Sequence, residues 1–280
     1  MDKLLTYCGH TVDSLVYYGH QYWIDAADPR TKHFPMVEGG IWKILLIMGC
    51  YLLLIKKLLP DYMRDRKPYQ LRVPILAFNT LMVAINGYFF YEIVTNLEYG
   101  IRFLDFRYPD RHDFSDKTLR ELNLGWWGWI SRFLDMLDTV FFVLRKKDNQ
   151  VTFLHVYHHT AVPFLGWFSM KINPLAPIIG LFGLFNTAIH VLMYSYYSLS
   201  SFGPRMRPYL WWKKYITQLQ LLQFLICGSY GCVLFCLQTG YPAVWFWVCV
   251  GQNPLFFYLF NDFYRKSYKK MNNNDYMCYL

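Results

Sequence analysis

Residues 175–197 read LAPIIGLFGLFNTAIHVLMYSYY, a stretch that contains no Asp, Glu, Lys or Arg. About 20 apolar residues in a helix are enough to cross the hydrocarbon core of a bilayer. The rest of the chain repeats this pattern, since it is 55% hydrophobic and 20% aromatic and places apolar runs between basic loops. Only helices and closed barrels satisfy their own backbone hydrogen bonds in lipid, and runs of this length favour helices. The sequence therefore predicts an all-α polytopic membrane protein.

Seven transmembrane helices are predicted, with six as the alternative because Lys43 interrupts the first apolar run and three charges interrupt the third. The predicted spans are residues 39–55, 73–95, 126–144, 151–170, 175–197, 215–237 and 242–262. Together they form one membrane domain at residues 39–264. An N-terminal segment at residues 1–38 precedes it, and a basic, polar tail at residues 265–280 follows it.

The net charge of +9 is distributed unevenly along the chain. Four segments, at residues 56–72, 145–147, 205–214 and 265–270, hold 17 of the 28 Lys and Arg residues. Cytosolic loops carry such an excess, so these segments and the C-terminus are expected in the cytosol and the N-terminus in the lumen. This distribution argues against nucleic acid as a partner. It favours membrane lipid, and secondarily anionic head groups or a phosphorylated substrate.

Three histidines lie close together in the segment His155-Val-Tyr-His158-His159. Residues three and four apart share one face of a helix, so the three imidazoles are expected side by side. Polar groups at membrane depth are costly and usually mark a functional site. We refer to His155, His158 and His159 as the histidine box, and a fourth histidine, His190, lies in the next predicted span.

Polar residues of several spans are expected at one depth. With a helical rise of about 1.5 Å per residue, the box and His190 lie roughly 6–12 Å below the cytosolic face. Other polar residues fall at roughly 9–14 Å, namely Asp135, Asp138, Gln220, Gln223 and Asn253. The positions beyond this layer are mostly apolar or aromatic, among them Phe182, Trp245 and Trp247. We interpret the layer as the floor of a pocket that opens to the cytosol and accepts an acyl tail.

Structural roles are the alternative for several of these residues. His190 is equally compatible with a hydrogen bond between helices, with Asn186 one turn earlier orienting its ring. For Arg132 and Asp135, three residues apart, an internal ion pair is the favoured interpretation. Hydrogen bonding between helices is likewise favoured for the two glutamines, Gln220 and Gln223.

The histidine count bears on the chemistry of the box. A di-iron site needs about eight imidazole or carboxylate ligands, whereas four of the eight histidines lie in the N-terminal segment or the acidic loop before residue 121. We therefore predict a site without metal, and a single zinc or iron with Asp138 as carboxylate ligand is an open alternative. Without metal, imidazoles act as acids, bases or nucleophiles, and acyl transfer from a thioester suits them. The rival functions are an iron-dependent lipid oxidase and a seven-helix receptor or lipid carrier without catalysis.

The chain resembles the very-long-chain fatty acid elongase family from Asp28-Pro29-Arg30 to its C-terminal tail. The resemblance rests on six motifs in order, RFLDMLDT at 132–139, FFVLRKK at 141–147, QVTFLHVYHH at 150–159, NTAIHVLMYSYY at 186–197, TQLQLLQF at 217–224 and FNDFY at 260–264. Two departures are conservative in charge, since Arg132 and Asp135 stand where the family usually has Lys and Glu. Tyr157, with Gln150 and Phe153, resembles the branches that elongate long and very-long chains.

The resemblance implies condensation of acyl-CoA with malonyl-CoA to 3-oxoacyl-CoA, CO2 and CoA, without a cofactor. It also implies seven helices, six of them ringed around an acyl tunnel, in the endoplasmic reticulum membrane. The implied partners are the reductases and dehydratase of the elongation cycle, and a homodimer stays open.

Site roles are predicted with the help of this resemblance. His158 and His190 are the expected acyl acceptors or acid–base pair, His155 and His159 orient rings, bind the malonyl unit or move protons, and Asp138 fixes an imidazole tautomer. Residues expected to contact substrate are Asp135, Arg145, Lys146, Lys147, Asn186, Tyr194, Gln220 and Gln223. For the basic residues at 145–147, which would meet CoA phosphates, a purely topological role is the alternative.

Overall fold

The computed structural model describes residues 16–96, 102–237, 240 and 243–269, and within them all regular structure is helical. This confirms the prediction of an all-α protein. The chain divides into two compact units, one formed by Met1–Gln70 with Pro109–Leu175 and the other by Leu71–Tyr108 with Ala176–Leu280. The histidine box lies in the first unit and His190 in the second.

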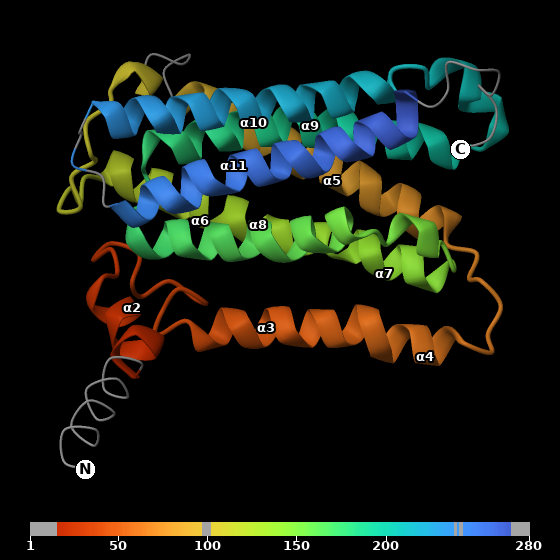
Figure 1. Cartoon of the computed structure of the whole chain (residues 1–280), viewed down its shortest axis with the longest axis horizontal. Coiled ribbons are helices and arrows are strands. Elements are labelled where there is room, and N and C mark those ends of the chain that lie inside the picture. The colour runs from red at the N-terminus through yellow and green to blue at the C-terminus, as the bar shows by residue number, and fades with distance from the viewer. Residues whose placement is uncertain (1–15, 97–101, 238–239, 241–242, 270–280) are drawn as a thin grey trace, which may run out of the picture. The chain divides into compact units, whose positions relative to one another are not determined.

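The first unit contains the N-terminal helices and the helix of the histidine box (Figure 1). Its elements are η1 (Tyr17–Gln21), α2 (Tyr22–Asp25), α3 (Trp42–Leu53), η2 (Leu54–Leu58), α4 (Leu59–Met63), α6 (Asp116–Asp135), α7 (Leu137–Leu144), η4 (Asp148–Gln150) and α8 (Phe153–Ile172). Helix α8 packs against α6 and α3, and α7 packs against α4. Helical structure continues from α3 through η2 into α4, so it extends past the predicted end of the first span at residue 55.

Helix α6 begins ten residues before the predicted third span, which was placed at 126–144. Ser115 caps its first turn by accepting a hydrogen bond from the Thr118 backbone N–H. Just before the cap, the Asp113 carboxylate accepts hydrogen bonds from Thr118 Oγ1 at 2.6 Å and from the Ser115 N–H at 2.9 Å. These bonds, that from Thr118 above all, lower the pKa of Asp113 to about 2. A capped polar turn therefore starts this helix before its apolar part begins.

The second unit is built from four long helices, α5 (Arg72–Asn96), α9 (Pro177–Ser201), α10 (Lys213–Cys236) and α11 (Ala243–Tyr264), together with η5 (Pro204–Tyr209) and η6 (Arg265–Lys269). Helix α9 lies against α5 and α10, and α10 lies against α11 (Figure 1). Three of these helices, α5, α9 and α10, are long and apolar enough to cross a membrane. They match the spans predicted at 73–95, 175–197 and 215–237 to within four residues at each end.

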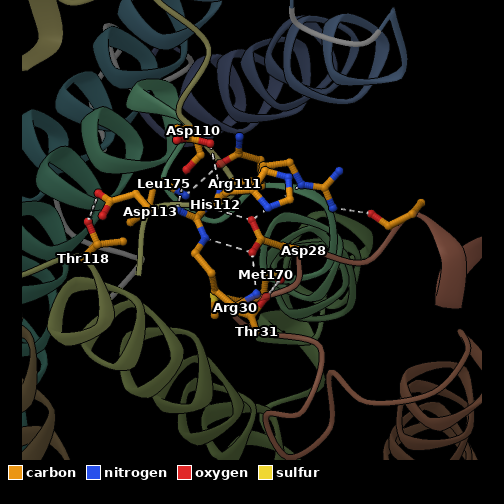
Figure 2. A network of polar contacts seen from close by, with 12 residues as sticks. Asp28, Arg30, Thr31, Asp110, Arg111, His112, Asp113, Thr118, Met170 and Leu175 are labelled. Carbon is orange, nitrogen blue, oxygen red and sulfur yellow. Dashed lines mark hydrogen bonds and ion pairs between the residues drawn. The ribbon is translucent and has the colours of Figure 1, made fainter. Parts of the chain in front are cut away.

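A buried polar network ties the N-terminal segment to the rest of the first unit, as Figure 2 shows. The Arg30 guanidinium donates to both carboxylate oxygens of Asp28, at 3.0 and 2.8 Å, and to the Asp110 carbonyl at 2.7 Å. Asp28 donates its N–H to the Lys171 carbonyl at 2.7 Å, at the end of α8. Nearby, the Arg111 guanidinium lies 3.8 Å from the Asp28 carboxylate. Segment 28–31 is thereby fixed to the end of α8 and to the loop before α6.

Candidate histidine site

The three histidines of the box lie together on the first two turns of α8. The ring centroids of His155 and His159 are 4.2 Å apart, and those of His158 and His159 are 5.4 Å apart. Thr152 caps the helix by accepting a hydrogen bond from the His155 backbone N–H at 3.2 Å. His159 is buried and the other two rings are partly buried. The structure thus brings together the three rings that the spacing predicts, with their roles still predictions.

A tryptophan of α6 contacts the helix just beyond the box. Trp129 Nε1 donates to the Pro163 carbonyl at 2.8 Å. A Cβ at Gly166 would overlap the Trp129 ring, so glycine is required where α6 and α8 approach each other. Pro163 has no N–H to donate to the carbonyl of His159, four residues earlier. The helical hydrogen-bond ladder is therefore interrupted at the box itself.

His155 has a side-chain partner from another helix. Its Nε2 atom lies 2.8 Å from Thr139 Oγ1 on α7, and the same oxygen lies 2.7 Å from the Tyr51 hydroxyl on α3. Neither Thr139 nor Tyr51 is among the site residues predicted from the sequence. The one sequence signal for Thr139 is its place next to Asp138 within the motif at 132–139. Asp138 itself is buried, and its action on an imidazole tautomer stays a prediction.

Arg132 and Asp135, near the end of α6, form the ion pair that the sequence favours. Arg132 Nη1 lies 3.1 Å from Asp135 Oδ2, and both side chains are less than one-tenth exposed. Arg132 also donates to Ser131 Oγ at 3.0 Å. Because a buried carboxylate needs a compensating charge, the pair has a structural role of its own. Contact between Asp135 and a substrate stays a prediction.

The basic residues at 145–147 stand at the end of α7. Lys146 adopts a left-handed backbone conformation with φ of 53°, and the Lys147 N–H donates back to the Phe142 carbonyl at 2.9 Å, which closes the helix. Lys146 Nζ donates to the Arg64 carbonyl at 3.0 Å. Lys146 and Lys147 are exposed, and Arg145 is half-buried. The helix dipole also favours cations at this end of α7. The position of the three basic residues is therefore compatible both with contact to CoA phosphates and with a purely topological role.

In the second unit, Asn186, His190 and Tyr194 follow one another at four-residue intervals on α9, and all three are buried. The ring centroids of His190 and Tyr194 are 5.8 Å apart, and Tyr194 also meets Phe78 of α5 at 6.0 Å. On α10, Gln223 is buried and Gln220 is half-buried. The structure therefore gathers three predicted site residues on one face of α9. That His158 and His190 face each other stays a prediction from the sequence.

Three buried polar residues of α5, Asn79, Asn86 and Glu92, were not predicted from the sequence. Asn79 is 2% exposed, and its amide nitrogen has no hydrogen-bond partner within the described residues. At about 1.5 Å per residue it lies roughly 10 Å from the start of α5, the depth predicted for the histidines. An unsatisfied buried donor costs about 1–3 kcal/mol. The sequence signal for Asn79, an amide side chain within an apolar run, was available.

Comparison with known proteins agrees with the resemblance seen in the motifs. A family model described as ELO, the GNS1/SUR4 family, matches residues 36–275. A very long chain fatty acid elongase of Aedes aegypti is 38% identical over 260 residues, which is 92% of this chain and 70% of that protein. Very long chain fatty acid elongase 7 of Rattus norvegicus is 37% identical, over 89% of this chain and 88% of its own. Very long chain fatty acid elongase 1 of Homo sapiens is 36% identical, over 87% of each chain. The chain belongs to the ELO (GNS1/SUR4) family.

Proposed function

We propose that this protein is a membrane enzyme of fatty acid elongation. It condenses a long-chain or very-long-chain acyl-CoA with malonyl-CoA to give 3-oxoacyl-CoA, CO2 and CoA. The single observation that carries the proposal is the gathering of three imidazoles on α8 of a chain from the ELO family. The names of its relatives, very long chain fatty acid elongases, support a role in lengthening acyl chains.

The imidazoles supply what this reaction needs from a protein. A neutral ring of His158 or His190 attacks the acyl thioester carbonyl, the C–S bond breaks, and CoA leaves as the thiol with the proton that the acylated ring releases. Loss of CO2 from the malonyl unit then leaves a carbanion at its α-carbon. That carbon attacks the acyl group, the C–N bond breaks, and the departing imidazole takes up a proton from solvent. In the alternative route, the same rings act as acid and base while acyl-CoA and malonyl-CoA are bound together.

The expected location follows from the charge distribution and the family. We place the enzyme in the endoplasmic reticulum membrane with seven spans, the C-terminus in the cytosol and the N-terminus in the lumen. CoA esters would reach the box from the cytosol, where Arg145, Lys146 and Lys147 meet their phosphates. The product would pass to the reductases and dehydratase of the elongation cycle.

Product analysis tests this function. Purified protein in detergent is incubated with malonyl-CoA and a panel of saturated and monounsaturated acyl-CoAs. The CoA esters are then separated by chromatography and identified by mass spectrometry. We expect each accepted substrate to give a 3-oxoacyl-CoA whose acyl chain is longer by two carbons. Hydroxylated or desaturated acyl-CoA of unchanged length would support the oxidase alternative instead.

Metal content separates the two enzyme classes independently of the product. Active protein is expected to contain no stoichiometric iron or zinc, and chelators should leave its rate unchanged, because four histidines at catalytic depth are too few for two irons. Elemental analysis alongside activity assays checks this. One equivalent of tightly bound iron, with activity lost when it is removed, would favour the oxidase.

The closed end of the acyl tunnel gives a test of chain-length control. On α9, the half-buried Phe182 lies eight residues before His190, which is about 12 Å along the helix. If Phe182 closes the tunnel, Phe182→Ala should lengthen the longest product by two or more carbons, since each buried methylene contributes about 0.8 kcal/mol. Leu192→Ala, at an exposed position of the same helix, is the matched control.

The same prediction covers Trp245→Ala and Trp247→Ala, whose side chains lie outside the described residues. Product length for each variant is measured with the acyl-CoA panel. If all three variants fold, turn over and keep the parent distribution, the tunnel ends elsewhere.

A further inference from the structure

We propose that Thr139 and Tyr51 are positioning residues for the histidine box, holding His155 through a hydrogen-bond chain that serves both of its protonation states. This inference rests on the proposed condensation and adds two residues to its machinery. The chain joins three helices of the first unit, with Tyr51 on α3, Thr139 on α7 and His155 on α8. The two contacts are 2.7 and 2.8 Å long, and both are ordinary hydrogen-bond lengths.

Four other threonines inside helices use their hydroxyls differently from Thr139. Thr80, Thr95, Thr160 and Thr187 each donate to the carbonyl four residues earlier in their own helix. This is how a hydroxyl inside an apolar helix normally satisfies itself. The Thr139 hydroxyl instead contacts two side chains of other helices, one 16 and the other 88 residues away in the chain. Thr139 is the third residue of α7, and the carbonyl four residues earlier belongs to Asp135, the last residue of α6. Its hydroxyl joins α7 to α3 and α8 instead.

Burial makes the contact specific. Thr139 is fully buried, and Tyr51 is 7% exposed. Buried polar groups are costly unless they are paired, so the hydroxyls and the His155 ring hold one another in a single arrangement. The His155 ring also contacts the rings of Phe142, at 5.2 Å between centroids, and of His159, at 4.2 Å. A change at Thr139 would therefore reach the rest of the box through the His155 ring.

The hydrogen-bond chain from Tyr51 through Thr139 to His155 can run in either direction. With His155 neutral, Tyr51 donates to Thr139 and Thr139 donates to Nε2, which leaves the ring proton on Nδ1. With His155 protonated, Nε2–H donates to Thr139 and Thr139 donates to Tyr51. Both states keep both hydrogen bonds, because each hydroxyl can donate or accept. His155 can thus take up and release a proton during condensation without losing its position.

The first test is kinetic. Thr139→Val removes the hydroxyl at nearly constant volume. We expect kcat to fall roughly 10- to 100-fold, the range found when a residue that orients a metal-binding histidine is removed. The KM for malonyl-CoA should change by less than about two-fold, the thermal midpoint should stay near the parent value, and Thr139→Ser should restore most of the rate. Tyr51→Phe should lower kcat less, because Thr139 still reaches His155. The matched controls are Thr80→Val and Tyr62→Phe, which remove hydroxyl contacts that do not belong to the hydrogen-bond chain of His155.

The second test does not depend on activity. With isotope-labelled histidine, the ring nitrogen signals of His155 are identified by their loss in His155→Gln and compared between the parent and Thr139→Val. We expect the Nε2 signal to move in Thr139→Val and to return in Thr139→Ser. An unchanged signal, an unchanged kcat, or a loss of kcat in step with stability that Ser does not rescue would each overturn the proposal. If the Nε2 signal moves but the parent protein does not condense acyl-CoA with malonyl-CoA, the contact between Thr139 and His155 is supported and the proposed function is refuted.

Discussion

His158→Ala and His190→Ala are each expected to lower the condensation rate by roughly a thousand-fold or more. The two rings are the predicted acyl acceptors or acid–base pair, and removing one member of a cooperating pair costs nearly the whole effect. The double variant should therefore be no slower than either single variant. Initial rates of product formation, measured on protein that elutes as a single folded species in detergent, give the comparison.

The control for this prediction is a histidine outside the site. His112→Ala changes an exposed residue in the loop before α6 and should keep the parent rate. Near-parent turnover by a folded His158→Ala or His190→Ala variant would remove that residue from the catalytic role assigned to it. Loss of folding in both variants would point to the helix-to-helix hydrogen bonding that the sequence left open for His190.

Arg30→Ala is expected to be the most destabilising single substitution considered for the first unit. The Asp28 and Arg30 side chains are 0% and 1% exposed. Removing the guanidinium leaves a buried carboxylate compensated by the backbone N–H of residue 30, at 2.9 Å, and by the Arg111 guanidinium, 3.8 Å away. Breaking a buried pair in this way costs about 3–5 kcal/mol. We expect the midpoint of thermal unfolding to fall by roughly 10 °C or more, measured as the folded fraction that survives heating in detergent.

The chain offers a closely matched control. Arg107 and Asp105 repeat the geometry of Arg30 and Asp28, with two guanidinium contacts and a backbone N–H to the same carboxylate, but the Arg107 side chain is 87% exposed. Arg107→Ala should leave the thermal midpoint unchanged. If Arg30→Ala behaves like Arg107→Ala, the network of Figure 2 does not hold the N-terminal segment in place.

The sequence predicted the apolar helices well because their signal is local. Helices α5, α9 and α10 are long and nearly free of charge, so their ends were placed within a few residues. The predicted third span begins after the true start of α6 because Asp116, Lys117, Arg120 and Glu121 make the first turns of this helix polar. Ser115 is nevertheless a recognisable cap. The first span was ended too early because Lys56 and Lys57 interrupt the apolar pattern while the helix continues.

In the candidate site, too, the contacts within one helix could be predicted from the sequence, whereas those between helices could not. Three histidines at spacings of three and four must meet on a helix, and Arg132 and Asp135 can pair for the same reason. The contact of Thr139 with Tyr51 and His155 depends on how three helices pack, which no local pattern encodes. Asp28 and Arg30 are neighbours in sequence, but their burial depends on Asp110 and on the end of α8.

Acyl-CoA-dependent release of CO2 tests the central claim most directly. Purified protein is given malonyl-CoA labelled at its free carboxyl group, with and without a long-chain acyl-CoA, and the labelled gas is trapped. Condensation predicts release only when acyl-CoA is present, one CO2 for each 3-oxoacyl-CoA formed, and none above background from His158→Ala. A folded protein that releases no label with any acyl-CoA of the panel, or releases it equally without acyl-CoA, would contradict the assignment.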